Sequence, residues 1–347
     1  MGYAELRIAL DATYSAGGGL SGVGVYSREL LNGLAGSEFC ERWEWYYRAQ
    51  RFWRALKSPA PRNVTRRFLS DSWGLRGADL FHGLNQRLPR RRFRRQIATF
   101  HDLFVLSGEY SSREFRERFA KQAREAAAGA DLIIAVSAFT AGQVEEYLKV
   151  PRARIRVVHH GVLPRVVPLL AREKVVLCVG AIQRRKNQAA LVRAFRAMPQ
   201  GWKLVLAGSA GFGAEDTMRE VAASPRAADI LVTGYLDEAD IAGWYGRASI
   251  FAFPSLDEGF GMPVLEAMAA GVPVVTSQSS ALPEVAGDAA LLVDPGETEA
   301  RSQARRSLMI DVDLRQELTR RGMEWARTFT WGKAVRETWD VYRKILG

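Results

Sequence analysis

Short apolar runs alternate with amphipathic segments along the first half of the chain. The runs at residues 6–12, 97–106 and 131–137 are rich in residues that favour β-strands. The segments at 111–130 and 138–150, which follow two of these runs, repeat their apolar positions with a helical period. Strands that alternate with helices form parallel sheets covered by helices on both faces, so the pattern predicts an α/β fold.

The same pattern begins again after a stretch at 163–174 that proline and polar residues interrupt. Apolar runs at 175–182, 203–209 and 249–255 again alternate with helical segments. We therefore expect two doubly wound parallel-sheet domains in tandem, with a hinge near residue 165 and a cleft between them. Ligands of such sheets bind at the carboxyl ends of the strands, so the turns after the strands are where chemistry is expected.

Composition and cysteine content limit the class of protein. Hydrophobic residues make up 48% and charged residues 25% of the 347 residues, as in soluble globular proteins. No run reaches the roughly 20 apolar residues of a membrane span, and Glu5 and Arg7 interrupt the start where a secretory signal would be apolar. Cys40 and Cys178 lie far apart, which excludes a disulfide framework and a CxxC zinc site. These features indicate a cytoplasmic protein in a reducing compartment.

The net charge of +11 lies entirely in the first half of the chain. Residues 42–95 hold 15 basic residues and only three acidic ones. Aromatic residues are interleaved with these charges: Trp43, Trp45, Tyr46, Tyr47, Phe52, Trp53, Trp73 and Phe93. A positive face of this kind attracts polyanions, such as nucleic acid or anionic phospholipid. The alternative is a set of solvated arginines with no partner.

A glycine-rich loop follows the first predicted strand. Gly17, Gly19 and Gly22 match the pattern GxGxxG, which is typical of dinucleotide sites. Such a site also needs an acidic residue about 20 positions later, at the end of the second strand. Glu41 and Glu44 instead lie before or inside that strand. The loop is better explained by the approach of a phosphate or sugar to the backbone, or by a tight turn alone.

The densest group of candidate residues follows the predicted strand at 249–255. Gly259 and Gly261 form a loop whose amides can face a ligand, and Pro263 suits the first turn of a helix. Glu258 and Glu266 bracket this loop. Carboxylates beside amide donors suit a sugar nucleotide, with the diphosphate on the amides and the hydroxyls on the carboxylates.

Three cations stand where a helix begins after the strand at 175–182. Arg184, Arg185 and Lys186 are unfavourable at a helix N-terminus unless an anion binds there. Arginine makes bidentate contacts to phosphate and lysine supplies a point charge, so Arg185 and Lys186 are candidates for a diphosphate site. The alternative is a solvated basic turn.

Histidines also follow predicted strands in the first half. His101 and Asp102 come after one strand and His82 after another, which makes both histidines candidates for a cleft. His159 and His160 are interpreted as structural.

No metal site is expected, because the histidines and glutamates show no HExxH or CxxC spacing. Asp311 and Asp313 form a DxD pattern, but they lie in a helical region, where capping of the helix is the better interpretation.

Together these residues resemble the retaining GT-B glycosyltransferases of family 4. Glu258 and Glu266 match the E-x7-E motif of that family, and the turn VGAIQRRKN at 179–187 matches its phosphate-binding turn. The segments at 281–295 and 328–346 resemble the strand, turn and closing helix that follow. In the first half, HGLNQRLP, TFHDLF and the glycine loop are similar to acceptor-side elements.

The resemblance implies two Rossmann-like domains facing a central cleft. Residues 1–165 would bind the acceptor, residues 166–330 the nucleotide sugar, and the helix at 331–347 would pack back on the first domain. The implied reaction moves a hexose from a nucleotide diphosphate donor with its anomeric configuration kept. It requires no metal and no cofactor.

Residue roles follow from the same resemblance. Catalysis is expected of His101, Glu258, Lys186 and Arg185. The donor site would consist of Gly19, Gly180, Arg184, Glu258, Gly259, Phe260, Gly261, Met262, Pro263, Val264 and Glu266. The acceptor site would contain Gly22, His82, Asn85 and Asp102. Many members have arginine after the glycine of the first motif, but here Ala181 follows Gly180, so Arg185 or Arg184 would supply that charge.

The expected chemistry is stabilisation of the leaving diphosphate by cations and helix-terminal amides. Apart from Asp102, the turns of the first half offer no carboxylate nucleophile, so attack on the face of the leaving group is favoured over a covalent intermediate.

The expected donor is GDP-mannose, with dTDP-rhamnose, UDP-glucose and UDP-N-acetylglucosamine as alternatives. The expected acceptor is a glycolipid or oligosaccharide of a cell-surface glycan. Binding to the inner face of the plasma membrane through residues 42–95 follows as a hypothesis. A sugar-nucleotide epimerase and a basic nucleic-acid-binding protein are the alternative classes.

Overall fold

The computed structural model describes residues 6–39, 42–70, 77–90, 92–163, 171–295 and 311–347. The chain divides into two compact units. Unit 1 comprises Met1–Leu106, Glu114–Gly161 and Thr330–Gly347, and unit 2 comprises Ser107–Arg113 and Val162–Phe329. The predicted hinge near residue 165 lies outside the described residues.

Unit 1 is built on a seven-stranded sheet with the order β3-β2-β1-β4-β5-β6-β7, in which every pair of neighbours is parallel. The strands are β1 Arg7–Asp11, β2 Arg42–Tyr47, β3 Val64–Phe68, β4 Leu80–Gly83, β5 Arg95–Phe100, β6 Leu132–Ala135 and β7 Ile155–Val157. The α-helices are α1 Gly22–Ala35, α2 Ala49–Ala55, α3 Phe104–Ser107, α4 Arg113–Gly129, α5 Ala138–Leu148 and α13 Trp331–Leu346.

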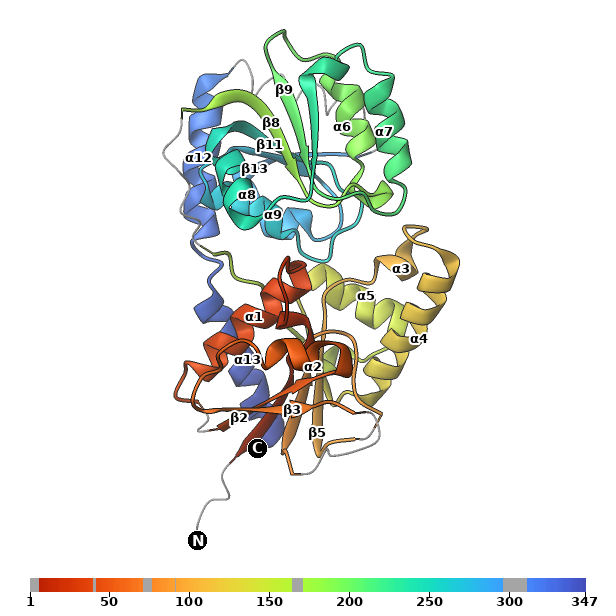
Figure 1. The fold of residues 1–347 in the computed structure, drawn as a ribbon, viewed down its shortest axis with the longest axis vertical. Helices are drawn as coiled ribbons and strands as arrows, with labels where there is room; N and C mark the ends of the chain where they lie inside the picture. The colour runs from red at the N-terminus through yellow and green to blue at the C-terminus, as the bar shows by residue number, and fades with distance from the viewer. Residues whose placement is uncertain (1–5, 40–41, 71–76, 91, 164–170, 296–310) are drawn as a thin grey trace. The chain divides into compact units, whose positions relative to one another are not determined.

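The alternation of side chains along β1 explains why both faces of this sheet are covered. Ile8 and Leu10 belong to the core cluster that also contains residues of α1 and α13, whereas Ala9 packs into a second cluster on the other face. Helices α1 and α13 lie side by side (Figure 1). Gly33 of α1 makes this approach possible, because a Cβ there would lie 2.5 Å from Cγ2 of Val335.

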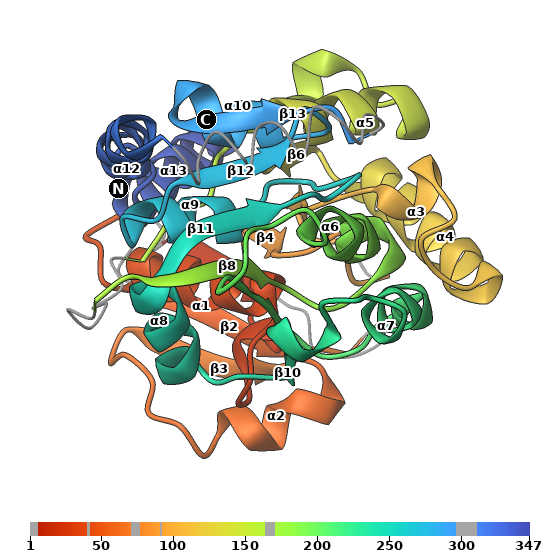
Figure 2. The same cartoon turned by 90° about the horizontal axis from the view of Figure 1, so that it is seen from above.

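Unit 2 contains a six-stranded sheet with the order β10-β9-β8-β11-β12-β13, again with parallel neighbours throughout. The strands are β8 Glu173–Val179, β9 Lys203–Ala207, β10 Ile230–Gly234, β11 Ala248–Phe253, β12 Val274–Ser277 and β13 Ala290–Val293. The α-helices are α6 Gln188–Phe195, α7 Ala214–Ala222, α8 Glu238–Arg247, α9 Met262–Ala269, α10 Leu282–Ala286 and α12 Val312–Ala326. Figures 1 and 2 show α6 and α7 on one side of this sheet and α8, α9 and α12 on the other.

The predicted α/β class with two parallel sheets is confirmed. One apolar run differs from its prediction: of residues 97–106, only those up to Phe100 form a strand, and Phe104 begins the short helix α3. Most residues of this run are buried, and buried residues occur in the strand part as well as in the helical part. An apolar, buried run does not by itself distinguish a strand from a helix.

Candidate functional site

The basic turn and the glutamate after β11 meet in one cluster of unit 2. Arg185 and Lys186 lie in the 3-10 turn η3, Arg184–Lys186, which follows β8. Strand β11 is the neighbour of β8 in the sheet, so the turns after the two strands lie at the same edge. Nη1 of Arg185 lies 3.0 Å from Oε2 of Glu258, and Nζ of Lys186 lies 2.7 Å from Oε1. The structure therefore brings together three of the four residues predicted to be catalytic.

Further hydrogen bonds hold this cluster in place. The hydroxyl of Ser255 donates to Oε1 of Glu258 at 2.6 Å, and the backbone N–H of Glu258 donates to the hydroxyl of Ser280 at 3.0 Å. The guanidinium of Arg185 also donates to the carbonyl of Asp257. The N–H of Leu256 donates to the carbonyl of Arg185 at 2.8 Å, which ties the loop after β11 directly to the basic turn.

The cluster is buried, which strengthens the electrostatic interactions between its charged groups. Glu258 is 7% exposed and Arg185 is 8% exposed. Burial alone would raise the pKa of Glu258, but the charges of Arg185 and Lys186 and the hydrogen bonds from Lys186 and Ser255 outweigh it and lower that pKa to about 2. Burial lowers the pKa of Lys186, and Glu258 opposes that shift. Glu258 is therefore the buried counter-ion of both cations, and it favours the protonated form of Lys186.

Two buried cations share this one carboxylate. Burial raises the pKa of the neighbouring Asp257 carboxyl, so Asp257 holds its negative charge less strongly than Glu258 does. The ammonium of Lys186 also lies 4.6 Å from the centre of the Phe253 ring, which supports its charge through a cation–π contact. Such an arrangement suits a ligand with several negative charges. Each cation can bind an anionic oxygen of the ligand, either in addition to the Glu258 carboxylate or in its place.

The glycine loop predicted to bind the donor lies directly before α9. Gly261 has φ +104° and is the N-cap of α9, where no side chain accepts a capping hydrogen bond, and Pro263 stands in the first turn. Val264 is completely buried and Phe260 is 5% exposed, so their side chains pack into the core. Glu266, further along α9, accepts a hydrogen bond from the hydroxyl of Tyr245 at 3.0 Å.

The backbone is tightly packed where β8 and β9 end. Gly180 has φ +137°, and a Cβ on it would lie 3.6 Å from Cε of Lys186. A Cβ on Gly208, after β9, would lie 2.1 Å from the carbonyl oxygen of Gly180. The absence of a side chain on Gly208 therefore lets the ends of β8 and β9 lie close together, whereas glycine at position 180 is favoured by its positive φ.

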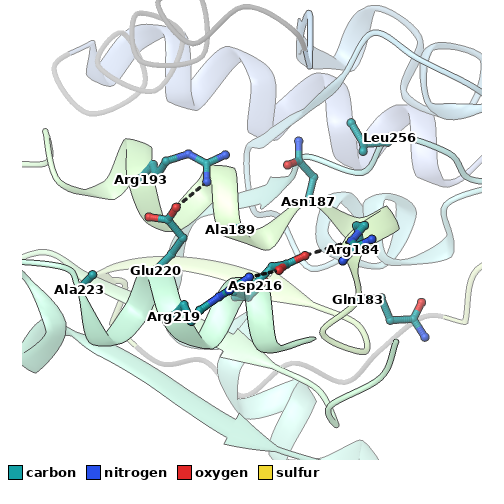
Figure 3. A pocket seen from close by; sticks show the side chains of 11 residues that line it. Gln183, Arg184, Asn187, Ala189, Arg193, Asp216, Arg219, Glu220, Ala223 and Leu256 are labelled. Atoms are coloured by element: carbon teal, nitrogen blue, oxygen red, sulfur yellow. Dashed lines mark hydrogen bonds and ion pairs between the residues drawn. The ribbon is translucent and has the colours of Figure 1, made fainter. Parts of the chain in front are cut away.

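Arg184 has a different environment from its two neighbours in η3. Its Nε donates to Asp216 of α7 at 3.0 Å, and Asp216 also pairs with Arg219. These residues line a cavity of about 530 Å³ between α6 and α7 (Figure 3). The predicted donor role of Arg184 therefore has less support than the roles of Arg185 and Lys186.

In unit 1, His101 follows β5 as predicted. Its Nε2 lies 3.0 Å from the carbonyl of Leu84, and burial lowers its pKa to about 4, so the ring is neutral at pH 7. The ring packs edge to face against Tyr26 with 4.7 Å between centroids. Asp102 follows directly on the same turn.

His82 is placed differently from its predicted role. It is 0% exposed, its Nδ1 lies 2.5 Å from the hydroxyl of Tyr342, and its Nε2 lies 2.7 Å from the hydroxyl of Thr99. A direct contact between His82 and an acceptor does not fit this burial. The strand-end pattern did not reveal Tyr342, because it belongs to α13, 260 residues further along the chain.

Three remaining acceptor-side and donor-side predictions lie in unit 1, two on loops and one at the start of a helix. Oδ1 of Asn85 accepts a hydrogen bond from the N–H of Gln86 at 2.8 Å. Gly19 is exposed with φ +64°, and Gly22 is the first residue of α1. The hydroxyl of Ser21 caps this helix by accepting from the N–H of Gly24, so the glycine loop ends as a normal helix start.

Sequence reasoning missed Ser255, Ser280 and Tyr245, which position Glu258 and Glu266. Single hydroxyl residues are too common for their type to indicate a role. Ser255 offered one usable signal, since it lies three residues before Glu258 and at the end of a predicted strand.

No metal centre is indicated in the part of the chain that the structure describes, where no group of three or more His, Cys, Asp or Glu residues could hold an ion. Asp311 caps α12 by accepting from the N–H of Leu314 at 2.8 Å, so the capping interpretation of the DxD pattern is confirmed for Asp311. Cys178 is buried as a free thiol, while Cys40 lies outside the described residues. Within the described ranges, no helix has both the length and the apolar character to cross a membrane.

The fold and this cluster define a glycosyltransferase. The family model for glycosyl transferases group 1 matches residues 164–325, and the model for glycosyltransferase family 4 matches residues 20–165. The chain is 31% identical to O-antigen chain mannosyltransferase B of Escherichia coli over 294 residues, which are 79% of this chain and 77% of that protein. The chain therefore belongs to glycosyltransferase family 4 and is an enzyme with the GT-B fold, as predicted. Family membership favours the glycosyltransferase class over the epimerase and nucleic-acid-binding alternatives.

Other relatives agree with this family. The serotype-specific mannosyltransferase WbdA of Escherichia coli is 26% identical over 273 residues, although the chain spans only 33% of its length. The structure of sucrose-phosphate synthase from Thermosynechococcus elongatus is similar in fold, with a TM-score of 0.78 over 98% of this chain and 99% of that one, at 22% identity. The Anabaena protein HepE, solved with UDP, has a TM-score of 0.73 over 98% of this chain and 100% of its own, at 18% identity.

Proposed function

We propose that this enzyme transfers mannose from GDP-mannose, with retention of anomeric configuration, to a lipid-linked or polysaccharide acceptor of a cell-surface glycan. The mannosyltransferase names of two Escherichia coli relatives support the sugar. A further relative, the MMP alpha-(1->4)-mannosyltransferase of Mycolicibacterium hassiacum, is 35% identical over 118 residues. The HepE structures with UDP and UDP-glucose keep a uridine donor as the main alternative.

The buried cluster of Arg185, Lys186 and Glu258 is the observation that carries this proposal. In the donor complex, Arg185 and Lys186 hold the diphosphate, and Glu258 turns from these cations towards hydroxyls of the sugar. When the bond to the sugar breaks, negative charge grows on the β-phosphate. Fixed cations in a buried site stabilise that charge without reorganisation of solvent.

The remaining predicted residues complete the proposed site. Amides of Gly259 and Gly261 lie near the diphosphate, Glu266 holds the ribose, and Tyr245 fixes the orientation of Glu266. His101 contacts the transferring sugar from unit 1, which takes the acceptor. Attack occurs on the face of the leaving group, and a diphosphate oxygen accepts the proton of the acceptor hydroxyl.

Nucleotide binding tests the donor part of the proposal. GDP, UDP, dTDP and ADP are compared by isothermal titration calorimetry, and GDP is expected to bind most tightly. Lys186→Ala should weaken GDP binding by about 1.5–3 kcal/mol, which is the worth of a hydrogen bond to a charged group. Arg193→Ala is the matched control, because Arg193 is an exposed cation of α6 that pairs with Glu220. Equal losses in the two variants would contradict the proposed site.

Product analysis tests the reaction. GDP-mannose is incubated with short mannose oligosaccharides, and the configuration of the new bond is read by nuclear magnetic resonance. An α-linked mannose product is expected. Trapping of a covalent glycosyl-enzyme on any carboxylate would refute the same-face mechanism.

A further inference from the structure

The basic and aromatic stretch at 42–95 does not form one uniform surface. Most of its aromatic side chains are in the interior: Trp43, Trp45, Tyr46, Tyr47 and Phe93 are all buried. Trp73 lies outside the described residues. The exposed apolar side chains of this stretch are instead concentrated on α2, on the loop after it and on β3.

We propose that α2 and β3 form a docking surface for an anionic lipid bilayer. We call this region the α2–β3 surface and define it as residues 49–70. Three apolar side chains stand out on it: Trp53 is 73% exposed, Leu56 46% and Phe68 47%. In a water-soluble unit, large apolar groups that gather at one place and remain exposed mark a binding surface.

The charges of the α2–β3 surface all have one sign. Residues 49–70 contain six basic residues and no acidic residue. Arg54, Lys57 and Arg62 are exposed. Arg67 is different, because it pairs at 2.8 Å with the buried Glu44 of β2. Exposed cations beside an exposed tryptophan match the headgroup region of an anionic bilayer, where cations meet phosphate and the indole meets the acyl boundary.

The α2–β3 surface is held in shape by its own contacts. Helix α2 packs against β2 and β3 (Figures 1 and 2). The Phe52 ring meets the Phe68 ring edge to face at 5.7 Å and the Trp53 ring at 5.6 Å. The guanidinium of Arg66 donates to the carbonyls of Ser58 and Pro59 at 2.7 and 2.8 Å, which fixes the loop between α2 and β3. A surface ordered before binding loses little conformational entropy when it docks.

Helix α4 is another basic segment of unit 1, and it lacks two of these features. It carries five basic residues but also three acidic ones, so its field is weaker. Its exposed apolar residue Phe115 is 37% exposed, and its ring lies tilted against the Phe119 ring with 6.0 Å between centroids. The contrast favours the α2–β3 surface and supplies a matched control on the same unit.

Vesicle co-sedimentation of the full chain tests the proposal. Vesicles of phosphatidylcholine alone are compared with vesicles that contain one-third phosphatidylglycerol, at low salt and at about 500 mM NaCl. The unchanged chain should bind the anionic vesicles at low salt and release them at high salt. Replacing three cations in R54Q/K57Q/R62Q should weaken binding about 100-fold, since each cation near such a surface contributes about five-fold.

A second variant and a control distinguish lipid from other polyanions. W53S/L56S should weaken vesicle binding at least ten-fold but leave salt-dependent retention on heparin unchanged, because heparin offers no acyl region. K121Q/R124Q on α4 should leave vesicle binding within two-fold. Circular dichroism and thermal unfolding check that all variants are folded, so the test does not depend on the identity of the donor.

Three results would overturn the proposal. One is equal binding to neutral and anionic vesicles. Another is a loss of vesicle binding in the α4 control as large as in the α2–β3 variants. The third is vesicle binding that W53S/L56S leaves intact, which would reduce the surface to a general polyanion site. None of these results depends on which sugar the enzyme transfers.

Discussion

Replacement of Glu258 by glutamine separates the structural role of this carboxylate from its role in transfer. Glutamine keeps the shape of the side chain and removes its negative charge. Arg185 and Lys186 then remain in the interior without the counter-ion that lies 3.0 and 2.7 Å from them. We expect Glu258→Gln to destabilise unit 2 at pH 7.

The size of this loss follows from the pKa of Glu258. The folded enzyme holds that pKa at about 2, whereas an ordinary glutamate has a value of 4.5. Because the folded pKa is depressed, the stabilisation is fully present above pH 4.5 and is lost as the pH falls towards 2. A difference of that size corresponds to about 3 kcal/mol at pH 7, and removal of one partner from a buried ion pair costs a similar amount.

Urea denaturation at pH 7 and ligand binding are the two assays. Asp216→Asn is the matched control, because Asp216 also binds two arginines but lies on the surface, where solvent screens the pairs. The control should change the free energy of unfolding much less than Glu258→Gln does. GDP should bind Glu258→Gln at least as tightly as the unchanged enzyme, because its diphosphate supplies the missing negative charge. Sugar transfer should nevertheless fall sharply, since the hydroxyl contacts of Glu258 are lost.

Two outcomes would refute this reasoning. If Glu258→Gln and Asp216→Asn destabilise the enzyme equally, burial does not strengthen the cluster. If Glu258→Gln loses GDP affinity as strongly as Lys186→Ala does, the carboxylate takes part in diphosphate binding and is not its competitor.

Two further predictions concern the packing of a glycine in unit 2 and the protonation of two buried histidines in unit 1. Gly208→Ala should destabilise unit 2 by about 1–3 kcal/mol, because the new methyl group would overlap the Gly180 carbonyl. As a control, Gly243→Ala in α8 meets no neighbour within 4 Å and should stabilise the helix by about 0.5–1 kcal/mol. Urea denaturation measures both variants, and equal changes in the free energy of unfolding would contradict the close contact at Gly208. The pKa values of His82 and His101 are lowered by burial to about 3 and about 4, so unit 1 should be fully stable above pH 6.5 and lose about 1.4 kcal/mol per pH unit for each histidine below it. A free energy of unfolding that stays constant between pH 7 and pH 5 would contradict this prediction.

The parallel-sheet fold and the position of the cluster could be predicted from the sequence. Periodicity distinguishes strands from helices where each element is long, and parallel sheets place their ligands after the strands. That rule places Arg185, Lys186 and Glu258 at one edge of the sheet. It could not place them in contact, because the order of strands β8 and β11 in the sheet is a tertiary property.

Positions that depend on distant parts of the chain could not be predicted. His82 follows a strand, as a cleft residue does, yet Tyr342 of α13 covers it. The tryptophans of β2 and Trp53 all lie in the same basic and aromatic stretch of the sequence. Trp43 is nevertheless buried between helices and sheet, while Trp53 is exposed. Charge and aromatic content measured along the chain therefore exaggerate the extent of a surface, and only packing shows which side chains belong to it.

Glu258 shows why a carboxylate belongs in a site for an anion. Two cations buried without a partner would destabilise the empty enzyme, and burial already lowers the pKa of Lys186. Glu258 pairs with both cations, and its hydrogen bonds from Ser255 and to Ser280 hold it within reach of them. In the proposed donor complex the diphosphate takes the place of the Glu258 carboxylate beside the cations, so the desolvation of Arg185 and Lys186 is already complete in the folded enzyme. Under the same proposal the Glu258 carboxylate then accepts hydrogen bonds from hydroxyls of the sugar, and one residue would link the stability of the empty site to recognition of the donor.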